Sequence, residues 1–164
     1  MYETSVGTLT HFLGGMGRFL KKAQAHAETR KIDPRALLDA RLFPDMYPLT
    51  RQVQITTDHA KGAGARLAGV PVPSFEDTEK SFDDLQARIA KTIDFLGTLK
   101  KEQFADAATR EVTLKLGGQE RKFTGADYFS RFALPNFYFH MATAYDILRH
   151  NGVELGKMDY MGRT

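Results

Sequence analysis

The sequence predicts an all-α fold, a four-helix bundle that carries one short β-hairpin before its last helix. Apolar residues recur at spacings of three and four in four long segments, which is typical of amphipathic helices. Helix start and stop signals bound these segments, and one stretch alternates apolar and polar residues around a Gly-Gly pair. The chain has 164 residues, 42% hydrophobic and 26% charged, so we expect residues 1–164 to form a single domain.

The first predicted helix covers about residues 5–29 and contains three glycines, at Gly14, Gly15 and Gly17. Each glycine costs about 1 kcal/mol relative to alanine inside a helix. We therefore expect another helix or subunit to pack closely against this side. The apolar face is formed by Val6, Leu9, Leu13, Met16, Leu20, Ala23 and Ala27.

Three further helices follow in the middle of the chain. A short helix is predicted over residues 33–38, with Asp33 as its N-cap and Pro34 as its first-turn proline. The second long helix covers residues 48–69, and its contact face consists largely of small residues. Ser74 with Asp77 resembles a capping box, and it predicts a third long helix that ends near Leu99.

The last part of the chain combines a hairpin with the longest apolar stripe. Alternation over residues 112–123, interrupted by Gly117 and Gly118, predicts a β-hairpin. Thr124 followed by Asp127 is a second cap signature. Pro135 cannot donate a backbone hydrogen bond, so we expect this segment to split or kink there, with a short helix to about Phe132 and a long one that starts near Leu134.

The composition excludes several classes of function. Cysteine is absent, so any metal must be held by histidine, carboxylate or amide oxygen. The net charge is +3, but the 23 basic residues are scattered among 20 acidic ones, which disfavours nucleic-acid binding. No apolar run approaches the roughly 20 residues of a membrane span, so we expect no membrane association and a cytoplasmic protein.

Three stretches carry a family resemblance: the opening MYETSVGTLTHFL, MYPLTRQVQITTDHAKGAGARLAG in the second long helix, and ALPNFYFHMATAYDILRHNG in the last. Together they resemble an uncharacterised bacterial domain-of-unknown-function family within the DinB/YfiT-like superfamily. The resemblance implies an up-down-down-up four-helix bundle that is often dimeric. Many members hold one divalent metal through three histidines, one from helix two and a His-x-x-x-His pair from the last helix.

Transferred to this chain, the resemblance places two histidines and one asparagine at the ligand positions. His140 matches the second histidine of the pair, Asn136 stands at the position of the first, and His59 is the one histidine on helix two. A divalent metal such as Zn²⁺ or Ni²⁺ would then be held by His59 and His140. Two histidines and an amide are a poor set for such a metal, so the alternative is that these side chains satisfy polar needs inside the bundle.

Two functional hypotheses follow from these residues. In the first, Gln52, His59, Asn136 and His140 form a polar pocket between helices two and four that binds a small molecule or a weakly held metal. This requires helices two and four to face each other. In the second, the protein is a non-catalytic dimeric scaffold that has lost the metal site. We expect a homodimer in either case, with Tyr138 and Phe139 as candidates for a dimer or ligand surface because they lie off the apolar stripe.

Overall fold

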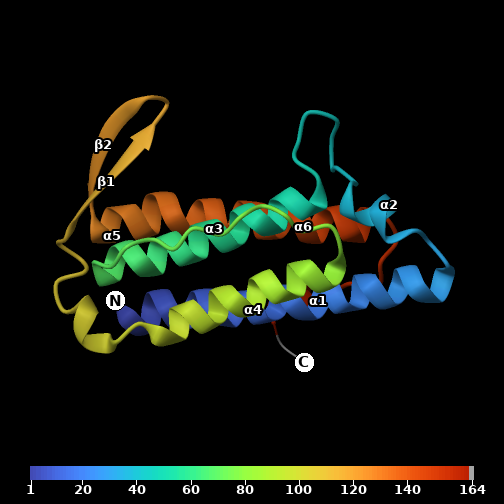
Figure 1. The fold of residues 1–164 in the computed structure, drawn as a ribbon, viewed down its shortest axis with the longest axis horizontal. Helices are drawn as coiled ribbons and strands as arrows, with labels where there is room; N and C mark the ends of the chain where they lie inside the picture. The colour runs from blue at the N-terminus through green and yellow to red at the C-terminus, as the bar shows by residue number, and fades with distance from the viewer. Residues whose placement is uncertain (163–164) are drawn as a thin grey trace.

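Four long helices lie side by side in two layers in the computed structural model, which describes residues 1–162 (Figure 1). Helices α1 (Thr8–Arg30) and α4 (Phe82–Thr98) form one layer, and α3 (Leu49–Ala68) and α6 (Leu134–His150) form the other. Helix α3 packs against both α6 and α4, and α1 packs against α4. The prediction of a mainly helical fold with one small hairpin is therefore confirmed.

Shorter elements connect and extend the long helices. A two-stranded antiparallel sheet is formed by β1 (Glu111–Leu116) and β2 (Gln119–Thr124), and Gly117 and Gly118 adopt the positive φ angles of the predicted turn, 58° and 80°. One face of β1 is buried, whereas β2 is mostly exposed. The remaining elements are η1 (Glu3–Gly7), α2 (Pro34–Leu38), η2 (Lys101–Phe104), α5 (Gly125–Asp127), η3 (Tyr128–Ala133) and α7 (Lys157–Tyr160).

Glycines allow the helices to approach one another closely. A Cβ atom on Gly64 of α3 would lie 2.5 Å from the Cδ2 atom of Leu96 in α4. The carbonyl of Gly17 in α1 accepts a hydrogen bond of 2.7 Å from the side chain of Gln86 in α4. The expected close packing around the glycines of the first helix is thus found, and it involves α4 at Gly17.

The start of α4 differs from the prediction. Ser74 and Asp77 do not cap a helix: residues 70–80 are non-helical, and α4 begins only after Ser81, whose hydroxyl accepts a hydrogen bond from the Asp84 amide. The carboxylate of Asp77 instead binds the guanidinium of Arg88 at 3.0 Å. The Asp77 side chain therefore forms a tertiary ion pair instead of the helix cap that the sequence pattern predicted.

The predicted boundary near Pro135 is found, since the long helix α6 begins at Leu134, but it is a change of helix type rather than a break. The backbone stays helical there, with φ and ψ of −63° and −46° at Leu134. The segment η3, directly before this point, forms a π-helical turn that runs straight into α6. A π turn is wider than an α turn, and Pro135 lies in the first turn of α6, where its missing N–H is tolerated. The cap signature at Thr124 is confirmed, since its hydroxyl accepts from the Asp127 amide at 3.2 Å.

The linker 70–80 runs back along the molecule between the end of α3 and the start of α4 (Figure 1). A buried arginine of α4 holds it in place. Arg88 is 3% exposed and binds Asp77 and Glu79 of the linker, each at 3.0 Å. It also binds Asp58 of α3 at 2.9 Å and donates from Nε to the Thr57 hydroxyl. One cation therefore joins α3, the linker and α4.

The C-terminal segment, up to Gly162, packs back on α1. His11 of α1 hydrogen-bonds the carbonyl of Met161 at 2.8 Å, and Arg18 donates to the carbonyl of Gly162 at 2.7 Å. Within residues 1–162, none of the helices combines the length and the apolar character that crossing a membrane requires.

We predict that Arg88→Met lowers the free energy of unfolding by about 3 kcal/mol, because the carboxylates around Arg88 lose their buried partner. Arg35→Met is the matched control: its ion pair with Asp39 is exposed and contributes at most about 0.5 kcal/mol. Urea unfolding followed by circular dichroism gives both values. Equal losses in the two variants would contradict the assigned role of Arg88.

Candidate functional site

The interface between α3 and α6 brings together three of the four predicted site residues. Gln52 and His59 lie on α3, two turns apart, and His140 lies on the facing side of α6. The Nδ1 atom of His140 is 2.7 Å from the Oε1 atom of Gln52. The rings of His59 and His140 are nearly parallel, with centroids 5.9 Å apart and an interplanar angle of 12°.

The contacts of Gln52 define the protonation of His140. The amide nitrogen of Gln52 donates to the Tyr47 carbonyl at 3.0 Å, so its oxygen is the atom that faces His140. An amide oxygen only accepts, hence Nδ1 of His140 carries the proton and Nε2 keeps its lone pair. Burial, and then the charge of Arg51, lower the pKa of His140, which favours this neutral form.

His59 is held in the neutral form more strongly. Its pKa is lowered from 6.5 to about 4, chiefly by burial and then by the neighbouring His140; Asp58 opposes this shift and Arg66 adds slightly to it. The ring packs edge-on against Phe132, with centroids 5.9 Å apart. At neutral pH the His59 side chain is therefore an uncharged imidazole with one nitrogen able to accept a proton.

His59 lines a small cavity. Within residues 1–162 no hydrogen bond to these nitrogens is formed, and no buried side-chain nitrogen or oxygen is left without a partner. Because His59 itself is not an exposed residue, its ring nitrogens must keep some exposure to solvent. The cavity has a volume of about 290 Å³ and is lined by Asp58, His59, Lys61, Arg66, Val72, Tyr128 and Phe132.

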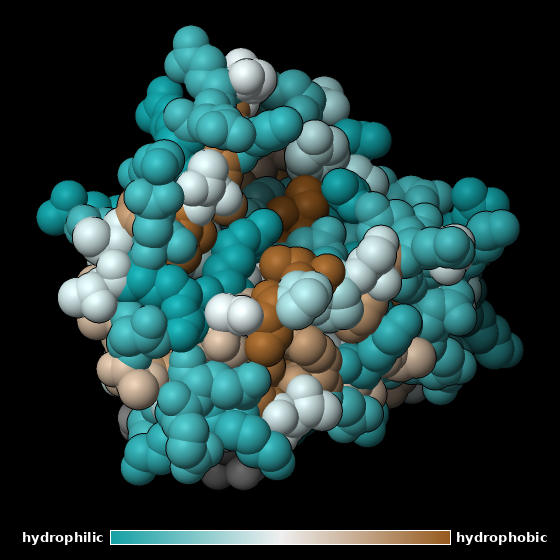
Figure 2. Space-filling view, turned by 60° about the vertical axis from the view of Figure 1, so that its left-hand side comes forward, coloured by the Kyte–Doolittle hydropathy of each residue, from teal (hydrophilic) through white to brown (hydrophobic). Residues whose placement is uncertain are grey.

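This cavity lies toward the end of the molecule where the hairpin projects. Figure 2 brings that end forward and shows hydrophobic side chains gathered in a hollow that hydrophilic side chains surround. Phe132 and Tyr128 come from η3, which follows the hairpin after the short helix α5, and Val72 comes from the linker that Arg88 holds. Three separate segments therefore build the walls around His59.

Asn136 does not join this cavity. Its side-chain amide donates to the carbonyl of Phe132, one turn earlier in the same helix, at 2.7 Å. The residue thus satisfies the backbone of its own helix, next to the π turn. Its side-chain amide makes no hydrogen bond to His59, so the structure does not support the predicted role of Asn136 beside that residue.

The donors present do not fit a divalent metal of the kind that the resemblance implies. Only His59 and His140 offer imidazole nitrogens at the interface, and Gln52 engages one nitrogen of His140. In the part of the chain that the structure describes, no group of three or more His, Asp or Glu side chains is placed to hold a metal ion. Zn²⁺ and Ni²⁺ sites require more nitrogen or carboxylate ligands than this pair supplies.

Sequence reasoning missed Arg66 and Tyr128, two polar side chains of the cavity. Arg66 follows His59 by seven residues, which is two helical turns and places both on one face of α3. That spacing could have indicated Arg66. Tyr128 is nearly fully buried by the hairpin and α3, and its sequence position alone does not reveal this.

Comparison with known proteins gives a family match, similar solved structures and one negative result. The family model described as "Domain of unknown function (DUF1993)" matches residues 1–161. A crystal structure of a DinB family member protein from Shewanella denitrificans is 40% identical, with a TM-score of 0.93 over 99% of this chain and 92% of that one. No curated protein matches. The resemblance inferred from the three sequence stretches is confirmed: the chain belongs to the DUF1993 family and has the fold of a DinB family member.

Proposed function

We propose that this protein binds a small molecule in the cavity beside His59, between α3, η3 and the linker, and that it does so without a metal. The observation that carries the proposal is the neutral His59 ring, which lines the cavity and whose nitrogens form no hydrogen bond within residues 1–162. The volume of about 290 Å³ suits a ligand of one or two rings. A polar group set among aromatic side chains is the usual composition of such sites.

His59 supplies the chemistry of this pocket. A neutral imidazole accepts a hydrogen bond from a ligand, and it can act as a general base on an acidic ligand proton. His140 lies against His59 and is oriented by Gln52, so it holds the His59 ring in place rather than contacting the ligand. Asp58, next in the chain, is already engaged by Lys61 and Arg88.

We also propose the up-down-down-up bundle arrangement for this chain. The support is the course of the linker, which returns along the molecule so that α3 and α4 run in the same direction (Figure 1). Helices α1 and α6 run the opposite way.

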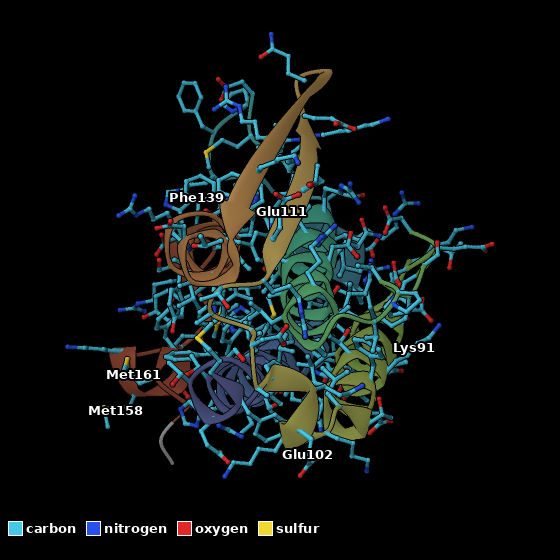
Figure 3. All side chains as sticks on the ribbon, turned by 90° about the vertical axis from the view of Figure 1, so that its left-hand side faces the viewer. Lys91, Glu102, Glu111, Phe139, Met158 and Met161 are labelled. Atoms are coloured by element: carbon cyan, nitrogen blue, oxygen red, sulfur yellow. The ribbon has the colours of Figure 1, made fainter. Side chains whose placement is uncertain are left out.

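A homodimeric scaffold is the second candidate, and exposed aromatic residues favour it. Phe139 of α6 is 57% exposed and lies on the outer side of that helix (Figure 3). Phe43 and Tyr47, in the loop before α3, are 64% and 56% exposed. Large apolar side chains of this kind are enriched at protein interfaces. Tyr138 contributes less, because it packs against Phe12 with ring centroids 5.1 Å apart.

The small-molecule proposal predicts that a set of neutral and anionic one-ring fragments contains binders for this cavity. In ¹⁵N-labelled protein, their chemical-shift changes should cluster at Val72, Tyr128 and Phe132, which line it. Val72→Trp should abolish them, because the larger ring fills the space beside His59. A stoichiometric divalent metal in freshly purified protein, or shifts confined to other surfaces, would contradict the proposal.

The neutral state of His59 predicts a pH dependence of stability. Its pKa is about 4 in the folded protein and 6.5 when unfolded, so the unfolded chain binds more protons between these values. Stability should be fully present above pH 6.5 and fall by about 2 kcal/mol as the pH approaches 4, after allowance for partial solvent exposure.

His59→Gln should flatten this part of the profile, whereas His150→Gln, at an exposed position, should leave it unchanged. Urea unfolding at a series of pH values measures the slope, and NMR titration of the ring measures the pKa. A pKa of His59 near 6.5 in the folded protein would contradict the prediction.

The scaffold candidate predicts a dimer that Phe139 helps to form. Phe139→Ser should raise the dimer dissociation constant at least tenfold, because burial of an aromatic ring contributes more than about 1.4 kcal/mol. Sedimentation equilibrium gives the constant. Met158→Ser is the control, since it removes an equally exposed apolar side chain on α7, on a different face (Figure 3). A monomeric wild-type protein would contradict this candidate.

A further inference from the structure

The guanidinium of Arg66 lies folded back over Gly62, one turn earlier in α3. A Cβ atom on Gly62 would be 2.5 Å from an Nη atom of Arg66 and 3.9 Å from the hydroxyl of Tyr128. The same Nη atom donates a hydrogen bond of 3.1 Å to that hydroxyl. The missing side chain at Gly62 therefore makes room for two polar groups to meet at the wall of the cavity.

The hydroxyl of Tyr128 has an unused hydrogen. Tyr128 is 1% exposed, and burial raises its pKa, so the hydroxyl stays protonated at neutral pH. Its oxygen accepts from Arg66, but among the hydrogen bonds of residues 1–162 its O–H donates to no acceptor. A buried hydroxyl can both donate and accept, and an unmade bond of this kind costs stability unless a ligand or water completes it.

Arg66 likewise has more hydrogen-bonding capacity than its protein partner uses. Of its five N–H donors, one binds Tyr128, and no acidic side chain within residues 1–162 forms an ion pair with it. Asp58, the carboxylate at the cavity wall, is bound by Lys61 and by Arg88, each at 2.9 Å. With His59 neutral, the charges of Asp58 and Lys61 cancel, and the cavity keeps the uncompensated positive charge of Arg66.

The remaining wall of the cavity is apolar. The rings of Phe132 and Tyr128 lie nearly parallel, with centroids 6.1 Å apart, and Val72 comes from the linker. A ligand that occupies this space must combine an anionic end with an apolar body. A carboxylate meets both donors, because its two oxygens match the fork of a guanidinium and accept from a hydroxyl.

We propose that Arg66 and Tyr128 form a carboxylate-binding subsite over Gly62, and that the ligand of the cavity is a small carboxylic acid with an apolar body. This inference rests on the proposed function and names the chemical class of its ligand. His59 then contacts the part of the ligand nearer to α6.

Three probes test the subsite on the wild-type protein: benzoate, its neutral analogue benzyl alcohol, and inorganic phosphate. Benzoate should bind at least tenfold more tightly than benzyl alcohol, shift the Gly62 amide resonance, and raise the pKa of His59 because it brings a negative charge close to the ring. Equal binding of both aromatic probes would overturn the carboxylate class and leave the proposed function standing. Tighter binding of phosphate than of benzoate would also overturn it, since an apolar body would then contribute nothing.

Two variants assign the effect to its residues. Arg66→Gln and Tyr128→Phe should each weaken benzoate binding about tenfold or more and leave benzyl alcohol binding unchanged. Arg149→Gln, the same charge change at an exposed position of α6, should not alter benzoate binding. Tyr128→Phe keeps the buried ring, so it tests the subsite even where Arg66→Gln disturbs folding. Unchanged benzoate affinity in a folded Tyr128→Phe protein overturns the subsite, and failure of every fragment to bind overturns the proposed function as well.

Discussion

The buried guanidinium of Arg88 is the interaction on which the rest of the structure depends. It binds carboxylates from α3 and from two positions of the linker, so it fixes where α4 lies and which course the linker takes. Val72, in the same linker, forms part of the cavity wall beside His59. Lys61 completes the charge balance through Asp58, next to His59 in the chain. Bundle architecture and candidate site therefore share one set of ion pairs, in which each buried charge is acceptable because it is partnered.

The helices could be predicted from the sequence because their apolar periodicity and their packing agree. The apolar face of the first helix, which begins at Val6, is buried as expected. One error arose where a tertiary contact overrides a local signal. Asp77 has the spacing of a capping residue, but a buried cation offers it a stronger partner. The long helix begins near Pro135 as predicted, but the segment before it is a π turn that continues into it without a break. Neither a distant arginine nor a local widening of the helix is visible in a pattern of neighbouring residues.

The candidate site was predictable only in part, for a similar reason. Helical spacing placed Gln52 and His59 on one face of their helix, and the family resemblance pointed to His140. The position of Arg66 depends on the absence of a side chain at Gly62, which governs where a long flexible side chain can lie. Asn136 stands at a ligand position of the resembling proteins, yet its amide binds its own helix. The direction of a side chain, rather than its residue type, decides whether the residue belongs to the candidate site.

The π turn of η3 has a consequence for comparing this chain with its relatives. A π turn contains one residue more than an α turn, and each residue of an α-helix turns the chain by about 100°. Compared with a family member whose helix is regular here, the residues between the hairpin and η3 are therefore shifted by one sequence position. An alignment without a gap would pair Tyr128 with a residue on a different face. Correspondence at this wall of the cavity has to be established by superposition of structures, and a single-residue deletion within η3 would turn Tyr128 away from Arg66.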